Sequence, residues 1–284
     1  MKRFKEQLKS RLAGTLPNEL LELLPSGFQR VGDVVILGLK PELLEHERGI
    51  GVAVLKLLPE NKTVCARFGG VSGDLRIPGV KKIAGNGTTT VHTENGCKYG
   101  LDVTKVMFAK GNVGERARLP RLVRHGETII DMFAGIGYFT VPVAKKSRPC
   151  VVYAIEKNPE SVRFLKENLK LNGITGVEVI EADNRDAGLH KLNNAADRVI
   201  MGYLPGTEKF LPAAFGFLKQ DGGIIHFHNT YRKQELWETP RSELEAAAMC
   251  TGYKLDSISY RGIVKHFAPG VEHVVIDAHF SRAS

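Results

Sequence analysis

The residues best suited to chemistry lie between Thr128 and Gly137, in the segment T-I-I-D-M-F-A-G-I-G. A short apolar run that ends in Asp131 predicts a strand, and a turn containing Gly135 and Gly137 leads into a helix expected over residues 138–146. Glycines after a strand let the backbone approach a ligand closely, and a helix N-terminus offers unpaired N–H groups. The segment favours a ligand-binding loop over a glycine turn that only joins a strand to a helix.

An acidic residue follows the next expected strand, residues 151–155, at Glu156. A carboxylate at that place can accept hydrogen bonds from both hydroxyls of a ribose. The third small position of the dinucleotide motif G-x-G-x-x-G/A is Thr140 here, and no triphosphate-binding G-x-x-x-x-G-K-[ST] occurs in the chain. The two segments together predict a nucleoside-binding α/β domain.

Polar residues also follow the later strands of this half. Strands expected over residues 177–182, 198–201 and 224–227 are followed by D-N, G-Y-L-P-G and H-N-T. Short right-handed crossovers bring the carboxyl ends of parallel strands to one edge of a sheet. We therefore expect Asp131, Glu156, Asp183 and Tyr203 to line one crevice that suits S-adenosylmethionine, with Asp183 accepting the exocyclic amine of adenine.

The remaining pattern divides the chain into three parts. Helices are expected over residues 3–12, 17–24 and 41–57, strands over 28–39 and 63–67, a loop over 69–78, and a hairpin over 88–103 whose turn is Asn95-Gly96. Further helices are expected over 159–171, 208–218 and 235–249, and last strands over 254–260 and 273–280. This predicts a small α+β domain (1–105), a basic linker (106–126) and a catalytic α/β domain (127–284).

The excess of positive charge lies entirely before the glycine loop. Residues 1–126 hold 21 Lys and Arg against 12 Asp and Glu, a net charge of +9, whereas residues 127–284 hold 19 of each kind. Such asymmetry indicates a nucleic-acid-facing module beside a neutral catalytic one, and a merely solvated basic surface is the alternative. Spacing alone leaves Arg116 in the linker equally suited to a solvated helix face and to contact with the cofactor carboxylate or the substrate.

Composition limits the remaining classes. No apolar run approaches the length needed to span a membrane and no signal peptide opens the chain, so we expect a cytoplasmic protein. The cysteines at 65, 97, 150 and 250 are far apart and form no C-x-x-C, which disfavours a zinc site and a disulfide framework. We expect no metal and infer no obligate protein partner.

Several motifs are similar to those of one group of class I S-adenosylmethionine enzymes. They are D-M-F-A-G-I-G, A-I-E-K-N, E-A-D-N-R-D, H-F-H-N-T and H-F-A-P-G-V-E-H-V-V-I-D, with R-I-P-G-V-K-K-I-A-G and L-D-V-T-K-V-M-F in the first half. The group comprises the tRNA guanine-37 N1-methyltransferases and their relatives, the aminocarboxypropyltransferases of wybutosine synthesis. The resemblance covers nearly the whole chain. It implies a Rossmann-like class I methyltransferase domain preceded by a small RNA-side domain, and it points to archaea.

One position separates the two branches. The N1-methyltransferases carry Asn-Leu-Pro after the fourth strand, whereas this chain has Gly202-Tyr203-Leu204-Pro205, which looks like the aminocarboxypropyl branch. The resemblance thus implies transfer of the 3-amino-3-carboxypropyl group of S-adenosylmethionine to C7 of the tricyclic base 4-demethylwyosine at position 37 of tRNA-Phe, releasing methylthioadenosine. A tRNA guanine-37 N1-methyltransferase is the alternative, and a non-catalytic tRNA-binding protein with a retained cofactor fold is a third hypothesis.

The resemblance also implies roles for individual residues. The usual Phe-Ser-Pro of the linker is Phe108-Ala109-Lys110 here, so only a backbone contact to the cofactor is expected at Ala109. Arg116 is expected to hold the carboxylate of the donor. Tyr203 is equally suited to stacking on the tricyclic base and to being an ordinary loop aromatic. His228 is the nearest candidate for a general base, with a structural histidine as the alternative. The expected cofactor contacts are Ala109, Arg116, Phe133, Gly135, Glu156, Asp183 and Asn184.

Overall fold

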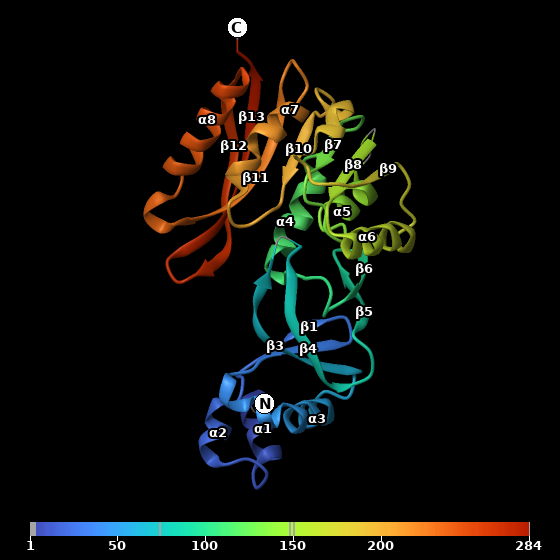
Figure 1. Cartoon of the computed structure of the whole chain (residues 1–284), viewed down its shortest axis with the longest axis vertical. Coiled ribbons are helices and arrows are strands. Elements are labelled where there is room, and N and C mark those ends of the chain that lie inside the picture. Colours follow the sequence, from blue (N-terminus) through green and yellow to red (C-terminus); the bar gives the residue numbers. More distant parts are fainter. Residues whose placement is uncertain (1–3, 74, 148, 150, 284) are drawn as a thin grey trace. The chain divides into compact units, whose positions relative to one another are not determined.

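The computed structural model describes residues 4–73, 75–147, 149 and 151–283. The chain forms two compact units: residues 1–93 with 98–108, and residues 94–97 with 109–284 (Figure 1). The segment expected to be a linker, 106–126, is divided between the two units after Phe108. The hairpin turn at 94–97 belongs with the second unit.

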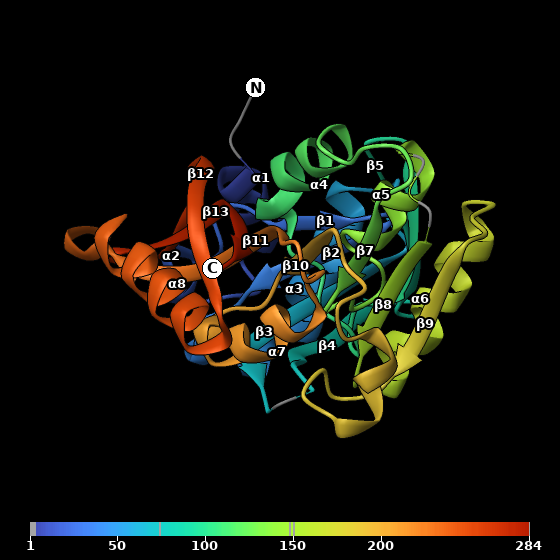
Figure 2. The same ribbon diagram turned by 90° about the horizontal axis from the view of Figure 1, so that it is seen from above.

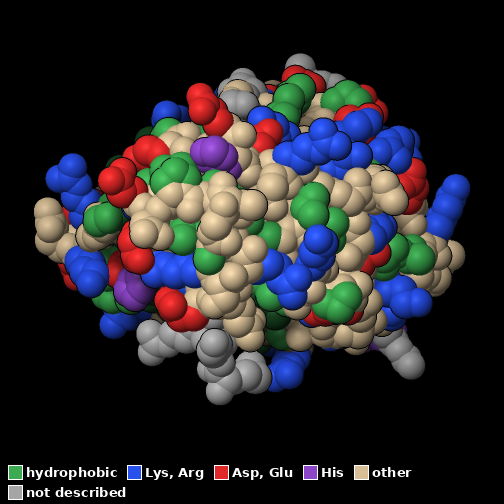
Figure 3. All heavy atoms as spheres, turned by 90° about the horizontal axis from the view of Figure 1, so that it is seen from below, with side chains coloured by type: hydrophobic (Ala, Val, Ile, Leu, Met, Phe, Trp, Pro, Cys, Tyr) green, Lys and Arg blue, Asp and Glu red, His purple; other side chains and the backbone are tan. Residues whose placement is uncertain are grey.

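Helices pack on one another and on a sheet in the first unit. They are α1 (Phe4–Leu12), α2 (Asn18–Leu23), a 3-10 helix (Pro41–His46) and α3 (Glu47–Leu57). Their apolar faces share a core with the neighbouring strands, and Leu8, Leu43 and Ile50 are fully buried in it. Figure 3 looks at the end of this unit that carries these helices, and Lys and Arg side chains are spread across it.

A four-stranded sheet completes this core, in the order β1-β2-β3-β4. Its strands are β1 (Gln29–Val31), β2 (Val34–Gly38), β3 (Thr63–Ser72) and β4 (Ile77–Gly85). The loop expected over residues 69–78 is wrong, because β3 continues to Ser72 and β4 begins at Ile77. A Cβ at Gly79 would lie 3.2 Å from the carbonyl oxygen of Gly70, so these glycines permit close approach of two strands rather than a loop.

The predicted hairpin is confirmed as β5 (Thr89–Glu94) and β6 (Cys97–Asp102). Asn95 and Gly96 both have positive φ, 50° and 74°. Two-residue turns of this kind require that conformation at both positions, which is why Asn-Gly is favoured there.

A seven-stranded sheet organises the second unit, in the order β12-β13-β11-β10-β7-β8-β9. Strands β7 (Thr128–Asp131), β8 (Val151–Glu156), β9 (Val177–Glu181), β10 (Arg198–Met201) and β11 (Gly223–Arg232) run parallel to one another. Strand β13 (Val271–Arg282) is antiparallel to β11 and to β12 (Tyr253–Ala268). The predicted class of fold is confirmed, and the carboxyl ends of β10, β7, β8 and β9 lie side by side.

Helices cover both faces of this sheet. Figure 2 shows α7 (Leu211–Phe217) and α8 (Glu238–Thr251) on one face, with α4 (Val113–Arg118) and α5 (Thr140–Lys146) on the other. Helix α6 (Pro159–Leu171) packs on β8 and β9. Short 3-10 helices occupy residues 110–112, 119–121, 187–192, 207–210 and 233–235. Apolar residues of α7 and α8, such as Phe215 and Leu244, form the larger core with the sheet.

The last three strands are longer than expected. β11 does not end at residue 227, because it pairs with β13 along its whole length, from Gly223 opposite Phe280 to Arg232 opposite Val271. The polar residues His228 and Asn229 therefore lie inside a strand. Residues 265–268, expected to lie between the last two strands, belong to β12, and Lys265, His266 and Ala268 pair with β13. No helix in the described parts of the chain is long and apolar enough to span a membrane.

Candidate active site

Asp131, at the end of β7, stabilises the glycine loop through hydrogen bonds to residues on both sides of it. Its side chain is fully buried, and its carboxylate accepts hydrogen bonds from Oγ1 of Thr140 at 2.8 Å and from the backbone N–H of Phe133 at 3.3 Å. Burial raises the pKa of Asp131 to about 6, although these hydrogen bonds act in the opposite direction. The prediction that Asp131 lines the crevice is wrong. Its buried carboxylate instead supports the glycine loop from inside the protein.

The loop itself requires glycine at two positions. Gly135 and Gly137 have φ of 54° and 97°, in the left-handed region. A Cβ at Gly135 would lie 2.3 Å from the Tyr138 ring, and one at Gly137 would lie 2.6 Å from Cγ2 of Val141. The loop is therefore a close backbone turn between β7 and α5, as the sequence predicts.

Glu156 ends β8 and turns its carboxylate toward this loop. Oε2 accepts a hydrogen bond from the N–H of Gly135 at 2.8 Å, and Oε1 accepts one from the N–H of Asn158 at 2.8 Å. Burial raises the pKa of Glu156, while the backbone donors lower it. Each carboxylate oxygen has a second lone pair, so the side chain can be fixed by the backbone and still accept ribose hydroxyls.

Asp183 and Asn184, just after β9, differ in their surroundings. Asp183 accepts two hydrogen bonds from the guanidinium of Arg185, at 2.9 and 2.8 Å, and Arg185 lowers the pKa of this carboxyl to about 2. Asn184 is buried, donates from Nδ2 to the carbonyl of Met132 at 2.9 Å, and its buried Oδ1 has no hydrogen-bond partner among the described residues. Asn184 thus offers the better acceptor for an adenine amine, whereas the adenine contact of Asp183 stays a prediction.

Three aromatic rings gather after β10. Tyr203 stacks on Phe133 with ring centroids 4.9 Å apart and planes at 26°. Phe210 meets both rings edge-on, at 4.9 Å from Phe133 and 5.5 Å from Tyr203. The structure thus brings the two predicted site residues Phe133 and Tyr203 together, in an arrangement suited to a flat ligand.

Arg116, on α4, is almost completely buried and already bound. Its Nε and Nη2 donate to the two carboxylate oxygens of Glu94 at 2.6 and 2.8 Å, and its Nη1 donates to the carbonyl of Ala109 at 3.0 Å. All three residues belong to the second unit. The contact between Ala109 and Arg116 joins two residues that the sequence predicts at the site, and cofactor binding by either one stays a prediction.

His228 lies inside β11, so its expected place at a strand end is wrong. The ring is buried, and its Nδ1 shares a hydrogen bond with Nε2 of His273 at 3.0 Å. Burial and the neighbouring His273 hold the pKa of His228 well below its usual range, so the imidazole is neutral. A role as general base stays a prediction, and the surroundings are those of a structural histidine.

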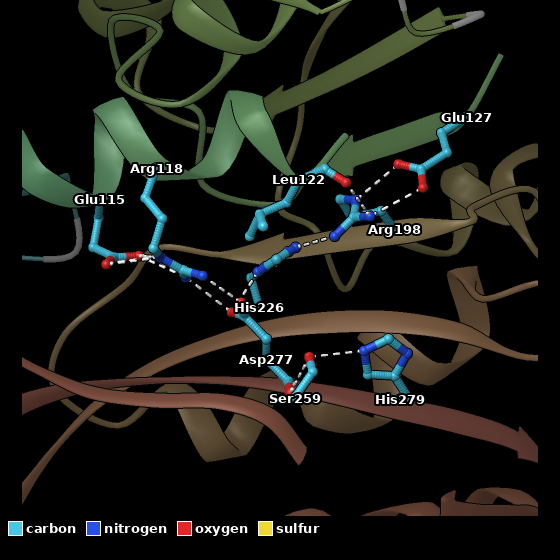
Figure 4. A network of polar contacts seen from close by, with 9 residues as sticks. All are labelled: Glu115, Arg118, Leu122, Glu127, Arg198, His226, Ser259, Asp277 and His279. Atoms are coloured by element: carbon cyan, nitrogen blue, oxygen red, sulfur yellow. Dashed lines mark hydrogen bonds and ion pairs between the residues drawn. The ribbon is translucent and has the colours of Figure 1, made fainter. Parts of the chain in front are cut away.

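A buried polar network on the α4 face of the sheet was not predicted. His226 bridges Arg198 and Asp277, with Nε2 at 2.6 Å from Nη1 of Arg198 and Nδ1 at 2.6 Å from Oδ1 of Asp277 (Figure 4). Arg198 also pairs with Glu127, and Asp277 also pairs with Arg118 of α4. Because arginine only donates, Nε2 of His226 is the acceptor and its Nδ1–H donates to Asp277. The network fixes α4, and with it Arg116, on the sheet.

The residues after these strands fit S-adenosylmethionine. The unpartnered Oδ1 of Asn184, the Glu156 carboxylate and the glycine turn supply an amine acceptor, a ribose acceptor and close backbone approach. Among the described residues no group of three or more His, Cys, Asp or Glu side chains could hold a metal ion. Cys65, Cys97 and Cys250 are free thiols, and Cys150 lies outside the described residues.

The parallel sheet, the glycine loop and Glu156 define a class I S-adenosylmethionine-dependent transferase domain. Residues 90–256 match the model of the TRM5/TYW2 methyltransferase domain, and residues 8–88 match that of the TYW2 N-terminal domain. The chain therefore belongs to the TRM5/TYW2 family.

Individual relatives agree with this assignment. The chain is 46% identical to a tRNA(Phe) (4-demethylwyosine(37)-C(7)) aminocarboxypropyltransferase of Methanocaldococcus jannaschii, covering 90% of this chain and 98% of the relative. It is similar to the crystal structure of Pyrococcus horikoshii TYW2 in complex with MeSAdo, with a TM-score of 0.84 and 37% identity, covering 99% of this chain and 100% of that one. It is 32% identical to the tRNA (guanine(37)-N(1))-methyltransferase Trm5b of Pyrococcus abyssi, covering 94% of this chain and 78% of the relative.

Proposed function

We propose that this chain transfers the 3-amino-3-carboxypropyl group of S-adenosylmethionine to C7 of 4-demethylwyosine at position 37 of tRNA-Phe, releasing methylthioadenosine. The name of the M. jannaschii relative, 46% identical over nearly the whole chain, supports this reaction. The enzyme is thus a tRNA-modifying transferase of wybutosine-derivative synthesis. A cytoplasmic location is part of this proposal, and it fits the tRNA-modifying activity named for the M. jannaschii relative.

One observation favours aminocarboxypropyl transfer over methyl transfer: the structure leaves no room for a side chain at position 202. A Cβ at Gly202 would lie 2.8 Å from Cε2 of Phe139, whose ring is buried in a core with Ile129 and Ile200. The resemblance of the sequence motifs implies an asparagine at the matching position of the N1-methyltransferases. Phe139 therefore excludes here the side chain that distinguishes the other branch.

The donor supplies a sulfonium with three electrophilic carbons, and the carbon aimed in line at the nucleophile decides which group moves. The new bond joins C7 of the base to the γ-carbon of the aminocarboxypropyl group. The bond from that carbon to sulfur breaks with its electron pair remaining on sulfur, and the C7 proton is then lost to solvent.

The chain contributes mainly by positioning. Glu156 would hold the ribose, Asn184 and Asp183 the adenine, and Ala109 and Gly135 would approach through their backbone. Tyr203, supported by Phe133, would stack on the tricyclic base. Arg116 would order the linker from Ala109 onward through its bond to that carbonyl.

The basic residues of 1–126 would bind tRNA phosphates. The net charge of +9 over residues 1–126 predicts a steep fall of tRNA affinity with salt, because phosphate binding releases counterions. Affinity that barely changes between low and physiological salt would contradict this role for the first half of the chain.

The deciding experiment uses S-adenosylmethionine labelled separately in its methyl group and in its carboxylate, with tRNA-Phe carrying either the tricyclic base or guanine at position 37. We expect carboxylate label in the tRNA that carries the tricyclic base, with release of methylthioadenosine. Methyl label in the guanine-37 tRNA, with release of S-adenosylhomocysteine, would sink the proposal in favour of an N1-methyltransferase. Absence of donor binding in equilibrium dialysis would favour the non-catalytic hypothesis.

A further inference from the structure

Lys265 of β12 is a partly buried lysine with no acidic partner in the described parts of the chain. Its stem lies against the backbone of the segment that precedes α4: a Cβ at Gly111 would lie 2.5 Å from Cδ and 3.2 Å from Nζ of Lys265. The ammonium group therefore lies next to the backbone two residues beyond Ala109. Partial burial of a charged lysine without a carboxylate partner is unfavourable in free energy, and binding of an anion would offset this cost.

The neighbouring cation, Arg116, already has its counter-ion. Both carboxylate oxygens of Glu94 accept hydrogen bonds from Arg116, so the two opposite charges compensate each other. Burial lowers the pKa of Lys265, and the positive charge of Arg116 lowers it further, which places the two cations close together. Lys265, in contrast, forms no ion pair within the described parts of the chain, so its positive charge is not compensated in this way.

A series of contacts connects Lys265 with the glycine loop. Lys265 is the cross-strand partner of His273, whose Nε2 is hydrogen-bonded to His228. The ring of His228 lies 5.4 Å from that of Phe139, which directly precedes α5 at the end of the loop. The buried Nδ1 of His273 also has no partner among the described residues. Side-chain contacts thus connect this strand pair, through His273, His228 and Phe139, with the glycine loop.

We propose that Lys265 binds the carboxylate of the aminocarboxypropyl group of the donor. This rests on the proposed function only in that the donor is S-adenosylmethionine. Arg116 then has a different role, because through Glu94 and the Ala109 carbonyl it orders the backbone on which the Lys265 stem lies. A carboxylate held by Lys265 on β12 would draw the tail of the donor toward the β11–β13 side of the site, whereas a tail held by the glycine loop alone would remain beside β7.

The test compares two ligands that differ by the group in question. Methylthioadenosine shares the nucleoside of S-adenosylmethionine but lacks the aminocarboxypropyl group. Titration calorimetry on the whole chain should show that Lys265→Gln weakens S-adenosylmethionine binding about tenfold or more, the scale of a charge-assisted hydrogen bond, and leaves methylthioadenosine binding unchanged. Lys265→Arg should retain most of the affinity for S-adenosylmethionine.

A matched control lies on the same strand. Lys254 is exposed at the other end of β12, at 3.9 Å from Asp256, and Lys254→Gln should change neither affinity. Equal weakening of both ligands by Lys265→Gln would overturn the proposal, because it would indicate a general effect on the site. Unchanged donor binding with weakened tRNA binding would also overturn it and assign Lys265 to a phosphate.

The outcome can be read separately from that of the labelling experiment. Both the methyl group and the aminocarboxypropyl group belong to the same donor, whose carboxylate is present whichever group is transferred. Methyl transfer would therefore contradict the proposed function. The affinities of the Lys265→Gln variant for S-adenosylmethionine and methylthioadenosine would still test the role of Lys265. Circular dichroism of each variant would confirm that the fold is retained.

Discussion

Arg118 of α4 and Asp277 of β13 form a two-fold hydrogen-bonded ion pair, at 2.5 Å between Nη1 and Oδ2 and 3.1 Å between Nη2 and Oδ1. Arg118 also lies over the ring of Tyr260, 4.0 Å from its centroid. The short helix α4, with only six residues, has little stability of its own. This pair therefore fixes the helix that carries Arg116.

Replacing Asp277 by alanine should be strongly destabilising. The change leaves Arg118 and the imidazole of His226 without their shared acceptor, and removal of one partner of a buried pair costs about 3–5 kcal/mol. Urea unfolding would measure this loss. Arg241→Gln breaks an exposed pair with Glu245 on α8 and should leave the free energy of unfolding almost unchanged, because water screens exposed ion pairs. Equal effects of the two substitutions would contradict the role assigned to the network.

The raised pKa of Asp131 predicts a specific pH dependence. Its pKa is about 6 in the folded chain and close to 3.8 in the unfolded one, so the folded state binds more protons between these values. Stability from this group is therefore greatest below pH 4 and falls as the pH rises to 6, by about 3 kcal/mol for a shift of this size.

Asp131→Asn removes the titration and serves as the comparison. The free energy of unfolding of the wild type, measured in urea from pH 4 to pH 7, should fall relative to that of the variant, and the difference should level off above pH 6. Carboxylates that do not interact with Asp131 titrate in both proteins and largely cancel. Parallel curves for the two proteins would show that Asp131 is not a titrating group in this range.

The glycine loop and the central strands could be predicted from the sequence because their signals are local. Gly135 and Gly137 mark a turn whose backbone only glycine adopts readily, and Glu156 directly ends an apolar strand. The Asn95-Gly96 turn of the β5–β6 hairpin is likewise encoded by two adjacent residues. No distant partner is needed to recognise these features.

The last three strands and the polar network could not be predicted in the same way. His228 and Asp277 are polar residues that are buried because strands far apart in the sequence pair with each other, as His226 does with Asp277. Polar positions of this kind are typical of loops when only neighbouring residues are considered. Likewise, nothing near Arg116 in the sequence indicates that Glu94 is its partner.

The packing of Phe139 against Gly202 predicts that a side chain at 202 is incompatible with this ring. Gly202→Asn should lower the free energy of unfolding by about 1–3 kcal/mol, because atoms added to a packed core force their neighbours to move. Phe139→Leu in the same chain should make the cost of Gly202→Asn smaller. A double-mutant cycle on urea unfolding measures this coupling, and strictly additive effects would contradict it.

Asn184 should determine affinity for the adenosine part of the donor. Its buried Oδ1 has no partner among the described residues, and an adenine amine would satisfy it. Asn184→Ala should therefore weaken binding of S-adenosylmethionine and of methylthioadenosine equally, by about threefold to tenfold, since a neutral hydrogen bond contributes about 0.5–1.5 kcal/mol. Lys265→Gln, in contrast, should affect S-adenosylmethionine alone.

The first unit offers a matched control for Asn184 at Asn61. The Asn61 amide is also buried, donates to a backbone carbonyl, that of Leu58 at 3.1 Å, and has an Oδ1 without a partner in the described parts of the chain. Asn61→Ala should alter the melting temperature about as much as Asn184→Ala and leave both affinities unchanged, because its orphaned oxygen lies in the other unit. If Asn184→Ala likewise changed only the melting temperature, its unpartnered oxygen would be a packing feature and the adenine contact would have to be sought at Asp183.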